Sequence, residues 1–285
     1  MKLATFTTGG APELGVVSGD SVIALRRAAP GLPTTMIELI AAWPTVEAEV
    51  RRIAAAGQDA LALDKVRLLA PVPRPGKIFA IGLNYADHIA ESGAETPAQQ
   101  IWFTKAVTAV TGPFDPVQIP KAAPMVDYEV EMVAVIGAGG RHITAAEAPR
   151  AVFGWCVGND VTERMWQHRT PQWSLGKSFD THAPFGPWIT TADEIADPHA
   201  LDLSCVVNGE SRQASNTRNL VFNVWDQIEH LSTAMTLEPG DVIFTGTPGG
   251  VGAAMSPRQF LKAGDRVRCE VEGLGAIETV CEAEA

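Results

Sequence analysis

Short apolar runs separated by glycine-containing turns predict a strand meander at the start of the chain. The runs are Leu3–Phe6, Leu14–Val17 and Val22–Leu25. Gly9-Gly10 and Gly19-Asp20 separate them, and pairs of this kind mark turns between strands. We therefore expect three consecutive strands in this region.

A helical pattern follows the meander. Thr35 is predicted to be the N-cap of a helix, with Glu38 three residues later as its capping-box partner. Pro44 is expected to end this helix, because proline lacks the amide N–H that a helix interior needs. A second helix over residues 46–56 should then stop at Gly57.

A proline-rich segment separates these elements from the rest of the chain. Residues 71–76 read Pro-Val-Pro-Arg-Pro-Gly, a stiff sequence with few amide donors for strand pairing. We therefore place a domain boundary at this linker. Residues 1–70 are expected to form a small N-terminal α+β domain, and residues 77–285 a larger one.

The larger part of the chain is rich in predicted strands. Asn208-Gly209, between two β-like runs, predicts a two-residue hairpin turn. The other predicted elements are strands after residues 241 and 265, a terminal hairpin over residues 267–281, and one helix over about residues 220–235. Many strands with few helices predict a strand-rich α+β fold with a curled or sandwiched sheet.

Composition and charge narrow the class of function. The chain has 285 residues, is 46% hydrophobic, and carries 22 basic against 33 acidic side chains, a net charge of −11. This balance argues against nucleic acid and anionic membranes as partners, but a local site can still bind a small anion. The N-terminus lacks the apolar stretch of a secretory signal, and no apolar run approaches the length of a membrane span. A cytoplasmic protein is expected.

The cysteines do not form a recognisable motif. No Cys-x-x-Cys pair occurs, so a zinc ribbon or a thioredoxin-like site is not expected. Each cysteine is predicted to be a small buried hydrophobe without a disulfide partner. The four positions are Cys156, Cys205, Cys269 and Cys281.

Two glutamates interrupt an apolar strand. Glu129 and Glu131 would point to the same face of a strand, about 7 Å apart along the chain. Val133 and Val135 continue that face, so the carboxylates lead directly into apolar surroundings. Like charges in such a place repel and lose hydration unless a cation holds them. Two solvated glutamates near a strand end are the alternative.

A third carboxylate follows a second buried strand. Residues 152–158 predict this strand, Asp160 stands at its end, and a helix is expected over residues 161–168. Asp160, Arg164 and Gln167 would then share one helix face. An N-cap aspartate with a solvated helix face is the alternative. Three oxygen donors would suit Mg²⁺, Mn²⁺ or Ca²⁺, whereas zinc is not expected.

A histidine and a glutamate form a second candidate group. His88 and Glu91 lie at i and i+3 in a short predicted helix that Gly93 closes. A carboxylate beside an imidazole fixes its tautomer and raises its basicity, which suits a general base. This spacing also occurs by chance. Lys177 lies among apolar and small residues, and a surface lysine is its plain interpretation.

Taken together, these segments resemble the fumarylacetoacetate hydrolase family. The resemblance covers about residues 75–282 in order and is closest to short bacterial members and related domain-containing proteins. The matching segments are residues 82–91, 111–113, 127–131, 158–162, 176–180, 207–210 and 239–248.

The resemblance implies a fold and a set of site residues. Family members have a mixed β-sandwich roll and are usually homodimers. The resemblance assigns a divalent metal, Mg²⁺ or Mn²⁺, to Glu129, Glu131 and Asp160, and a catalytic dyad on a mobile lid to His88 and Glu91. Its remaining assignments are a catalytic role for Lys177 and substrate contacts for Arg164, Gln167, Thr247 and Tyr85.

The reaction implied is metal-dependent hydrolysis of a carbon–carbon bond in a β-diketo acid, with release of pyruvate. Acylpyruvates, fumarylpyruvate and diketo-deoxy sugar acids are the substrate types, so the expected ligand is a small anionic 2-oxo acid. Decarboxylation of oxaloacetate or a related 2-oxo diacid is the alternative, and isomerisation also occurs in the family. A non-catalytic metal-binding protein would explain neither His88 nor Lys177.

One segment departs from the family pattern. Many relatives read Phe-Asp-Thr-Phe-Cys-Pro, whereas residues 179–184 here include His182 and Ala183 at the fourth and fifth positions. Because this stretch follows Lys177, the departure bears on substrate choice.

Overall fold

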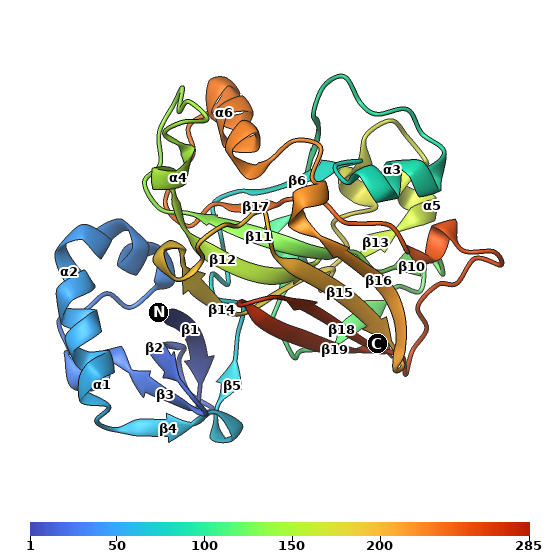
Figure 1. Ribbon diagram of the computed structural model, residues 1–285. Helices are drawn as coiled ribbons and strands as arrows, with labels where there is room; N and C mark the ends of the chain where they lie inside the picture. The colour runs from blue at the N-terminus through green and yellow to red at the C-terminus, as the bar shows by residue number, and fades with distance from the viewer.

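A mixed sheet of twelve strands runs from the N-terminal elements through the centre of the protein (Figure 1). The computed structural model describes residues 1–285. The strands of this sheet are β1 (Lys2–Thr7), β2 (Glu13–Ser18), β3 (Ser21–Ala24), β4 (Ala60–Ala62), β5 (Arg67–Leu68), β6 (Ile78–Gly82), β7 (Ile101–Thr104), β8 (Val110–Thr111), β11 (Val130–Ile136), β12 (Val152–Asn159), β14 (Ala183–Thr191) and β17 (Val242–Phe244). Most neighbours are antiparallel, but β17 pairs with β6 in parallel.

A second sheet of five strands packs against the centre of the first. Its strands are β9 (Val117–Ile119), β15 (Asp202–Val207), β16 (Glu210–Asn216), β18 (Arg266–Val271) and β19 (Gly275–Ala283). Two short strands, β10 (Val126–Asp127) and β13 (Thr162–Glu163), form a separate pair. The fold is therefore the strand-rich α+β arrangement with packed mixed sheets that the sequence predicts.

Strand β11 separates two hydrophobic cores. Val130, Met132 and Ala134 pack into a core of 31 residues shared with the five-stranded sheet. Val133 and Val135 face the opposite way, into a core of 26 residues shared with the N-terminal elements. Because side chains alternate along a strand, the face of Val133 is also the face of Glu129 and Glu131.

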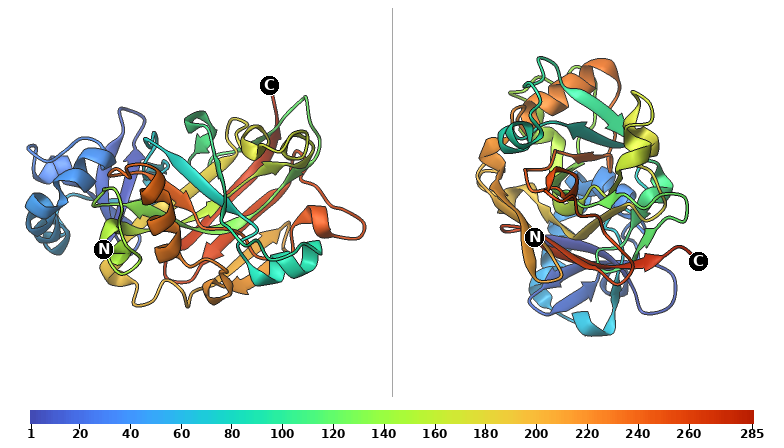
Figure 2. Two further views of the ribbon diagram at one scale, coloured as in Figure 1. Left: turned by 90° about the horizontal axis from the view of Figure 1, so that it is seen from above. Right: turned by 90° about the vertical axis from the view of Figure 1, so that its right-hand side faces the viewer.

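Six α-helices lie around the sheets. They are α1 (Leu25–Ala28), α2 (Met36–Ala56), α3 (Ala86–Ser92), α4 (Ala148–Ala151), α5 (Arg164–Gln167) and α6 (Val224–Ala234). Figure 1 shows α3 and α5 at one end of the molecule, far from α2 among the N-terminal elements. The N-terminal elements form the other end, which is also clear in the left view of Figure 2.

The N-terminal elements extend the central sheet. Strands β1, β2 and β3 form the predicted meander, with β1 antiparallel to β2 and β2 antiparallel to β3. On its other side β1 pairs with β14, where Lys2 lies opposite Thr190. The small N-terminal unit thus shares backbone hydrogen bonds with the larger part of the chain.

The prediction of two helices over residues 36–56 is wrong. The structure has one helix, α2, with Pro44 in its interior. The capping box of Thr35 and Glu38 is present, and Gly57 ends the helix in a left-handed conformation, as predicted. Leu39 before the proline and Val50 after it are buried in the same core, so tertiary packing holds both halves in one helix.

The strand and turn predictions in the second half of the chain are confirmed. Asn208-Gly209 joins β15 to β16, and β18 and β19 form the terminal hairpin. The helix expected over residues 220–235 begins later, at Val224. Asn223 caps it by accepting hydrogen bonds from the amides of Trp225 and Asp226, a signal that the periodicity did not reveal.

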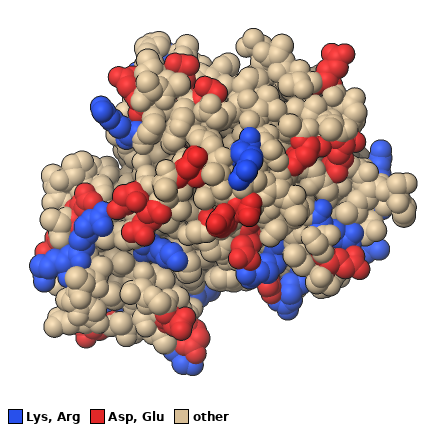
Figure 3. All heavy atoms as spheres, in the orientation of Figure 1, with Lys and Arg blue, Asp and Glu red and all other residues tan.

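The cysteine prediction is also confirmed, because all four thiols are free and buried. No helix has the length and apolar character that crossing a membrane would require. On the face shown in Figure 3, acidic and basic side chains are interspersed, without a continuous basic surface.

Candidate active site

Three carboxylates meet where β11 begins and β12 ends. Val130 lies opposite Asn159, so Glu129 precedes one strand while Asp160 follows the other. The amide of Asp160 donates a hydrogen bond to the carbonyl oxygen of Glu129 at 2.9 Å. One oxygen from each of Glu129, Glu131 and Asp160 lies within 4.8 Å of the others, and all three residues are buried. We call this group the carboxylate floor.

The prediction of a helix over residues 161–168 is wrong in its extent. Thr162 and Glu163 form β13 against Val126 and Asp127, and only the single turn of α5 follows. The Glu163 side chain caps this turn by accepting from the Trp166 amide. Asp160 is consequently positioned by the end of β12 and not by a helix face.

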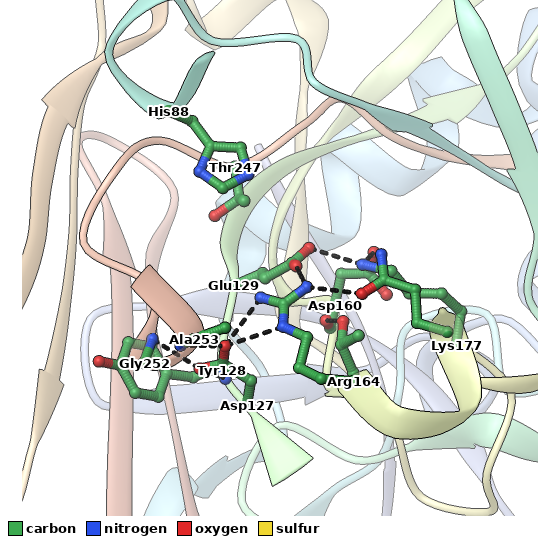
Figure 4. A network of polar contacts seen from close by, with 12 residues as sticks. His88, Asp127, Tyr128, Glu129, Asp160, Arg164, Lys177, Thr247, Gly252 and Ala253 are labelled. Carbon is green, nitrogen blue, oxygen red and sulfur yellow. Dashed lines mark hydrogen bonds and ion pairs between the residues drawn. The ribbon is translucent and has the colours of Figure 1, made fainter. Parts of the chain in front are cut away.

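Buried cations neutralise most of the carboxylate floor. The Lys177 ammonium donates to Glu129 at 2.7 Å and to Asp160 at 2.6 Å. Arg164 lies 2.6 Å from Glu129 and also pairs with Asp127. Figure 4 shows this network. Burial opposes ionisation of Glu129, but Lys177 and Arg164 outweigh it and lower the pKa of Glu129 to about 2.

Glu131 differs from its two neighbours because no cationic side chain contacts it. Its one hydrogen bond comes from the Gly246 amide at 2.7 Å. Burial raises the pKa of Glu131 well above its usual value, and the charges of Asp160 and Glu129 raise it further. Buried carboxylates that repel one another in this way favour a bound cation. The all-oxygen donor set fits a hard divalent ion such as Mg²⁺ or Mn²⁺.

Lys105 was missed by sequence reasoning. Its side chain is fully buried and its ammonium lies 2.5 Å from the Asp160 oxygen that Lys177 does not contact. Burial lowers the pKa of Lys105 in spite of this partner. A lysine one residue after the apolar strand β7 was the only signal in the sequence. Lys105 and Lys177 thus bind one oxygen of Asp160 each.

The histidine–glutamate pair lies on α3, which we call the dyad helix. His88 Nδ1 is 3.3 Å from a Glu91 oxygen, as the i, i+3 spacing predicts. The other Glu91 oxygen accepts from the Gly250 amide at 2.6 Å. In Figure 4, His88 stands apart from the ion pairs that join Glu129, Arg164 and Lys177. Gly93 closes the helix in a left-handed conformation, as expected.

A cavity of about 720 Å³ brings the dyad together with Glu129 of the carboxylate floor, whereas Glu131 and Asp160 are buried behind its wall. Its walls include most of the predicted site residues and several that were not predicted. The predicted ones are His88, Glu91, Glu129, Arg164, Gln167, Lys177 and Thr247. The unpredicted ones include Met125, Met165, His168, Trp173, Arg258 and Phe260.

Two polar residues in the wall are fixed by their neighbours. The Gln167 side-chain oxygen accepts from Arg164 at 3.0 Å. The Thr247 hydroxyl donates to the Val130 carbonyl at 2.9 Å and accepts from Gln213. Both side chains are therefore oriented before any ligand arrives.

Tyr85 is not brought into the cavity wall. Its side chain is fully buried, and its hydroxyl has no hydrogen-bond partner. Burial raises the pKa of Tyr85, with smaller contributions from the charges of Glu131 and Asp87. The substrate contact suggested for Tyr85 stays a prediction.

The His182-Ala183 departure also lies away from the cavity wall. Both residues are buried, and His182 Nε2 is 2.9 Å from the Gln118 carbonyl oxygen. Burial lowers the pKa of His182 to about 3. The structure therefore gives His182 a packing role rather than a place in the cavity.

Asp127 was overlooked although it opens the motif that contains Glu129. One of its oxygens accepts from the Gly252 amide at 2.8 Å, and the other accepts from Ala253 and from Arg164, both at 2.9 Å. Asp127 thus joins the guanidinium to the segment at Gly252. Its place at the start of an acidic alternation was the available signal.

A strand-rich roll with a buried carboxylate floor and a histidine–glutamate pair at one cavity defines a class of α+β enzymes. Residues 77–281 match the family described as fumarylacetoacetate (FAA) hydrolase C-terminal, and residues 1–71 match one described as Rv2993c-like, N-terminal. The chain belongs to the fumarylacetoacetate hydrolase family, as its motifs indicated.

Named relatives differ in the reaction that their names give. The chain is 45% identical to oxaloacetate tautomerase Fahd2a, mitochondrial, of Rattus norvegicus, over 93% of this chain and 86% of that protein. It is 34% identical to the maleylpyruvate hydrolase of Sphingobium sp. SYK-6, solved with manganese(II) and pyruvate, with a TM-score of 0.84 and full coverage of both chains. A fumarylacetoacetate hydrolase from Exiguobacterium antarcticum is 36% identical, also with full coverage of both chains, with a TM-score of 0.88.

Proposed function

We propose that this protein is a divalent-metal-dependent enzyme that forms the enolate of a 2-oxo acid. The observation that carries the proposal is the single cavity lined by a candidate base, His88, a buried ammonium, Lys177, and a floor carboxylate, Glu129. A cation held by Glu129, Glu131 and Asp160 would act as a Lewis acid toward the 2-oxo oxygen.

The residues of the chain divide the remaining work. Arg164 and Gln167 would bind the substrate carboxylate, since both line the cavity and are already oriented toward each other. His88, held by Glu91, would take a proton from the carbon next to the 2-oxo group. Lys177 would donate a hydrogen bond to the oxygen on which negative charge develops.

Keto–enol tautomerisation of oxaloacetate or a close analogue is the reaction that the relatives favour. In the ketonising direction a proton leaves the enol oxygen and another is added to the neighbouring carbon, so no bond between carbon atoms is broken. The support is the 45% identity to a protein named as an oxaloacetate tautomerase. His88 lines the cavity wall and would carry the proton at carbon.

Hydrolysis of a β-diketo acid with release of pyruvate is the second candidate. Here His88 would deprotonate a water molecule that attacks the distal carbonyl. The carbon–carbon bond between that carbonyl and the neighbouring carbon then breaks, which gives a carboxylic acid and the enolate of pyruvate. Its support is the hydrolase solved with manganese(II) and pyruvate, together with a cavity of about 720 Å³, large enough for substrates longer than oxaloacetate.

A substrate panel tests both reactions. Oxaloacetate enol, acetylpyruvate and fumarylpyruvate are each incubated with purified protein and Mg²⁺, Mn²⁺ or EDTA. Tautomerisation is followed by loss of the enol ultraviolet absorbance, hydrolysis by pyruvate release, and decarboxylation by carbon dioxide. His88→Gln should lower the metal-dependent rate by about 10²- to 10⁴-fold, while His230→Gln, on the exposed face of α6, serves as the matched control. Absence of metal-dependent turnover of all three substrates would refute the proposal.

A further inference from the structure

An arginine outside the predicted site lines the same cavity as Glu129 of the carboxylate floor. Arg258 lies in the segment after Val251–Ala254 and contributes to the cavity wall together with Arg164 and Lys177. It makes no ion pair or hydrogen bond within the chain. Two other arginines differ from it in this respect. The exposed Arg268 lies 2.9 Å from Glu270, and the partly buried Arg212 lies 2.9 Å from Glu210.

The backbone that carries Arg258 is anchored on both sides. The Gln259 amide donates to the Gly252 carbonyl at 3.0 Å, and the Leu261 amide donates to the Val126 carbonyl at 2.8 Å. Met255, three residues earlier, contacts the hydroxyl of Tyr128 through its sulfur at 3.9 Å. The guanidinium is therefore presented at the cavity from a held segment.

The acidic groups of the cavity are already occupied. Glu129 is paired with Lys177 and Arg164. Glu91 accepts from the Gly250 amide and faces His88. Neither carboxylate is an ion-pair partner of Arg258, so its charge is available to a ligand.

Positive charge extends across the cavity to this arginine. His168 lines the wall, and burial lowers its pKa. The charges of Arg164, Lys177 and Arg258 lower that pKa further, in this order. The charges of the floor cations and of Arg258 thus both act on His168. A ligand that is bound at the floor and extends past His168 would therefore approach a second cationic group, Arg258.

We propose that Arg258 binds a second carboxylate, at the far end of a dicarboxylic 2-oxo acid, and so determines substrate specificity. This inference rests on the proposed function, in which the 2-oxo acid end binds at the carboxylate floor. Arginine suits the role because its planar donors bind a carboxylate in a bidentate manner. The cavity of about 720 Å³ has room for a diacid longer than four carbons.

Two ligands of equal length test the proposal. Binding of 2-oxoheptanedioate and of 2-oxoheptanoate to the Mn²⁺-loaded protein is measured by calorimetry; only the first carries a distal carboxylate. The wild-type protein should prefer the diacid by about tenfold or more, the size expected for a hydrogen bond between charged groups. Arg258→Gln should reduce this preference to about one, and Arg258→Lys should keep part of it.

The matched control is Arg150→Gln, an exposed arginine on α4 outside the cavity, which should keep the wild-type preference. The same ratio in wild type and Arg258→Gln overturns the role of Arg258 while leaving the proposed function in place. Failure of both ligands to bind the wild-type protein overturns the proposed function and the role of Arg258 with it. The ratio of kcat/KM for fumarylpyruvate over acetylpyruvate should change in parallel with the binding ratio.

Discussion

The carboxylate floor and the dyad helix both contribute to one cavity, the floor through Glu129, but they are built very differently. The floor adjoins β11 and β12, two neighbouring strands whose residues are all buried. The dyad helix has seven residues, of which only Ile89 is buried. The floor is therefore rigid and desolvated, while the helix is held by few contacts.

The floor and the dyad helix also differ in their polar contacts. Floor carboxylates are held by side chains from three other segments, at Lys105, Arg164 and Lys177. The dyad helix is joined to the 249–250 segment through Asp87 and Glu91, which accept backbone amide hydrogen bonds at 3.2 Å and 2.6 Å. A fixed ion site combined with a lightly attached base suits an enzyme that must admit and release its substrate.

The largest effect is expected when the floor loses its cation. EDTA should lower turnover about a thousandfold or more, because Lewis-acid stabilisation contributes several kcal/mol to the transition state. Glu131→Gln should have the same effect, and it should also remove Mn²⁺ binding measured by electron paramagnetic resonance. Glu270→Gln, an exposed change on β18, is the control. Undiminished Mn²⁺ binding by Glu131→Gln would show that the floor is not the metal site.

The next largest effect is expected on the dyad helix. His88→Gln should lower kcat by about 10²- to 10⁴-fold, the usual contribution of a general base. The increase in melting temperature caused by Mn²⁺ should be retained, since His88 lies outside the floor. Loss of both activity and the Mn²⁺ effect would contradict the separation between the two regions.

A smaller effect is expected for Glu91→Gln. This change keeps the shape of the side chain but weakens its hydrogen bonds to His88 and to the Gly250 amide. A loss of roughly 10- to 100-fold in kcat is expected from one charge-assisted hydrogen bond. Faster amide exchange of residues 86–92, measured by mass spectrometry, should accompany it. Unchanged exchange would mean that Glu91 does not hold the helix in place.

The smallest effect concerns His182, which is buried away from the cavity wall. Burial lowers its pKa from 6.5 to about 3, so the folded state disfavours the charged form. The stability due to neutral His182 is present above pH 6.5 and decreases as the pH falls toward 3. At pH 5.5 the protonation of His182 in the unfolded state lowers the free energy of unfolding by about 1.4 kcal/mol. The free energy of unfolding of His182→Asn, measured with denaturant, should decrease less between pH 7 and pH 5.5 than that of the wild-type protein. An equal decrease in both proteins would exclude His182 as the source of this pH dependence.

Local patterns were sufficient to predict several parts of the protein. The alternation around Glu129 and Glu131 predicted a strand with both carboxylates on one face, and that face is where they lie. The capping box at Thr35 and the hairpin turn at Asn208-Gly209 also formed as expected. In each of these cases the deciding interactions lie within a few residues of one another, so the sequence pattern records them directly.

Other features depend on contacts between distant segments. Pro44 stays inside α2 because residues on both sides of it pack into a common core. Residues 162–163 become a strand because β10, more than thirty residues earlier, pairs with them.

The sequence by itself determined the strand-rich fold class and which residue types could bind a metal or act as a base. Only the tertiary structure decided that Lys105 supports Asp160 and that Arg258 faces the cavity. The physical reason is that periodicity and capping are short-range, whereas neutralising a buried charge requires a partner from another part of the fold. Such partners leave no regular spacing in the chain.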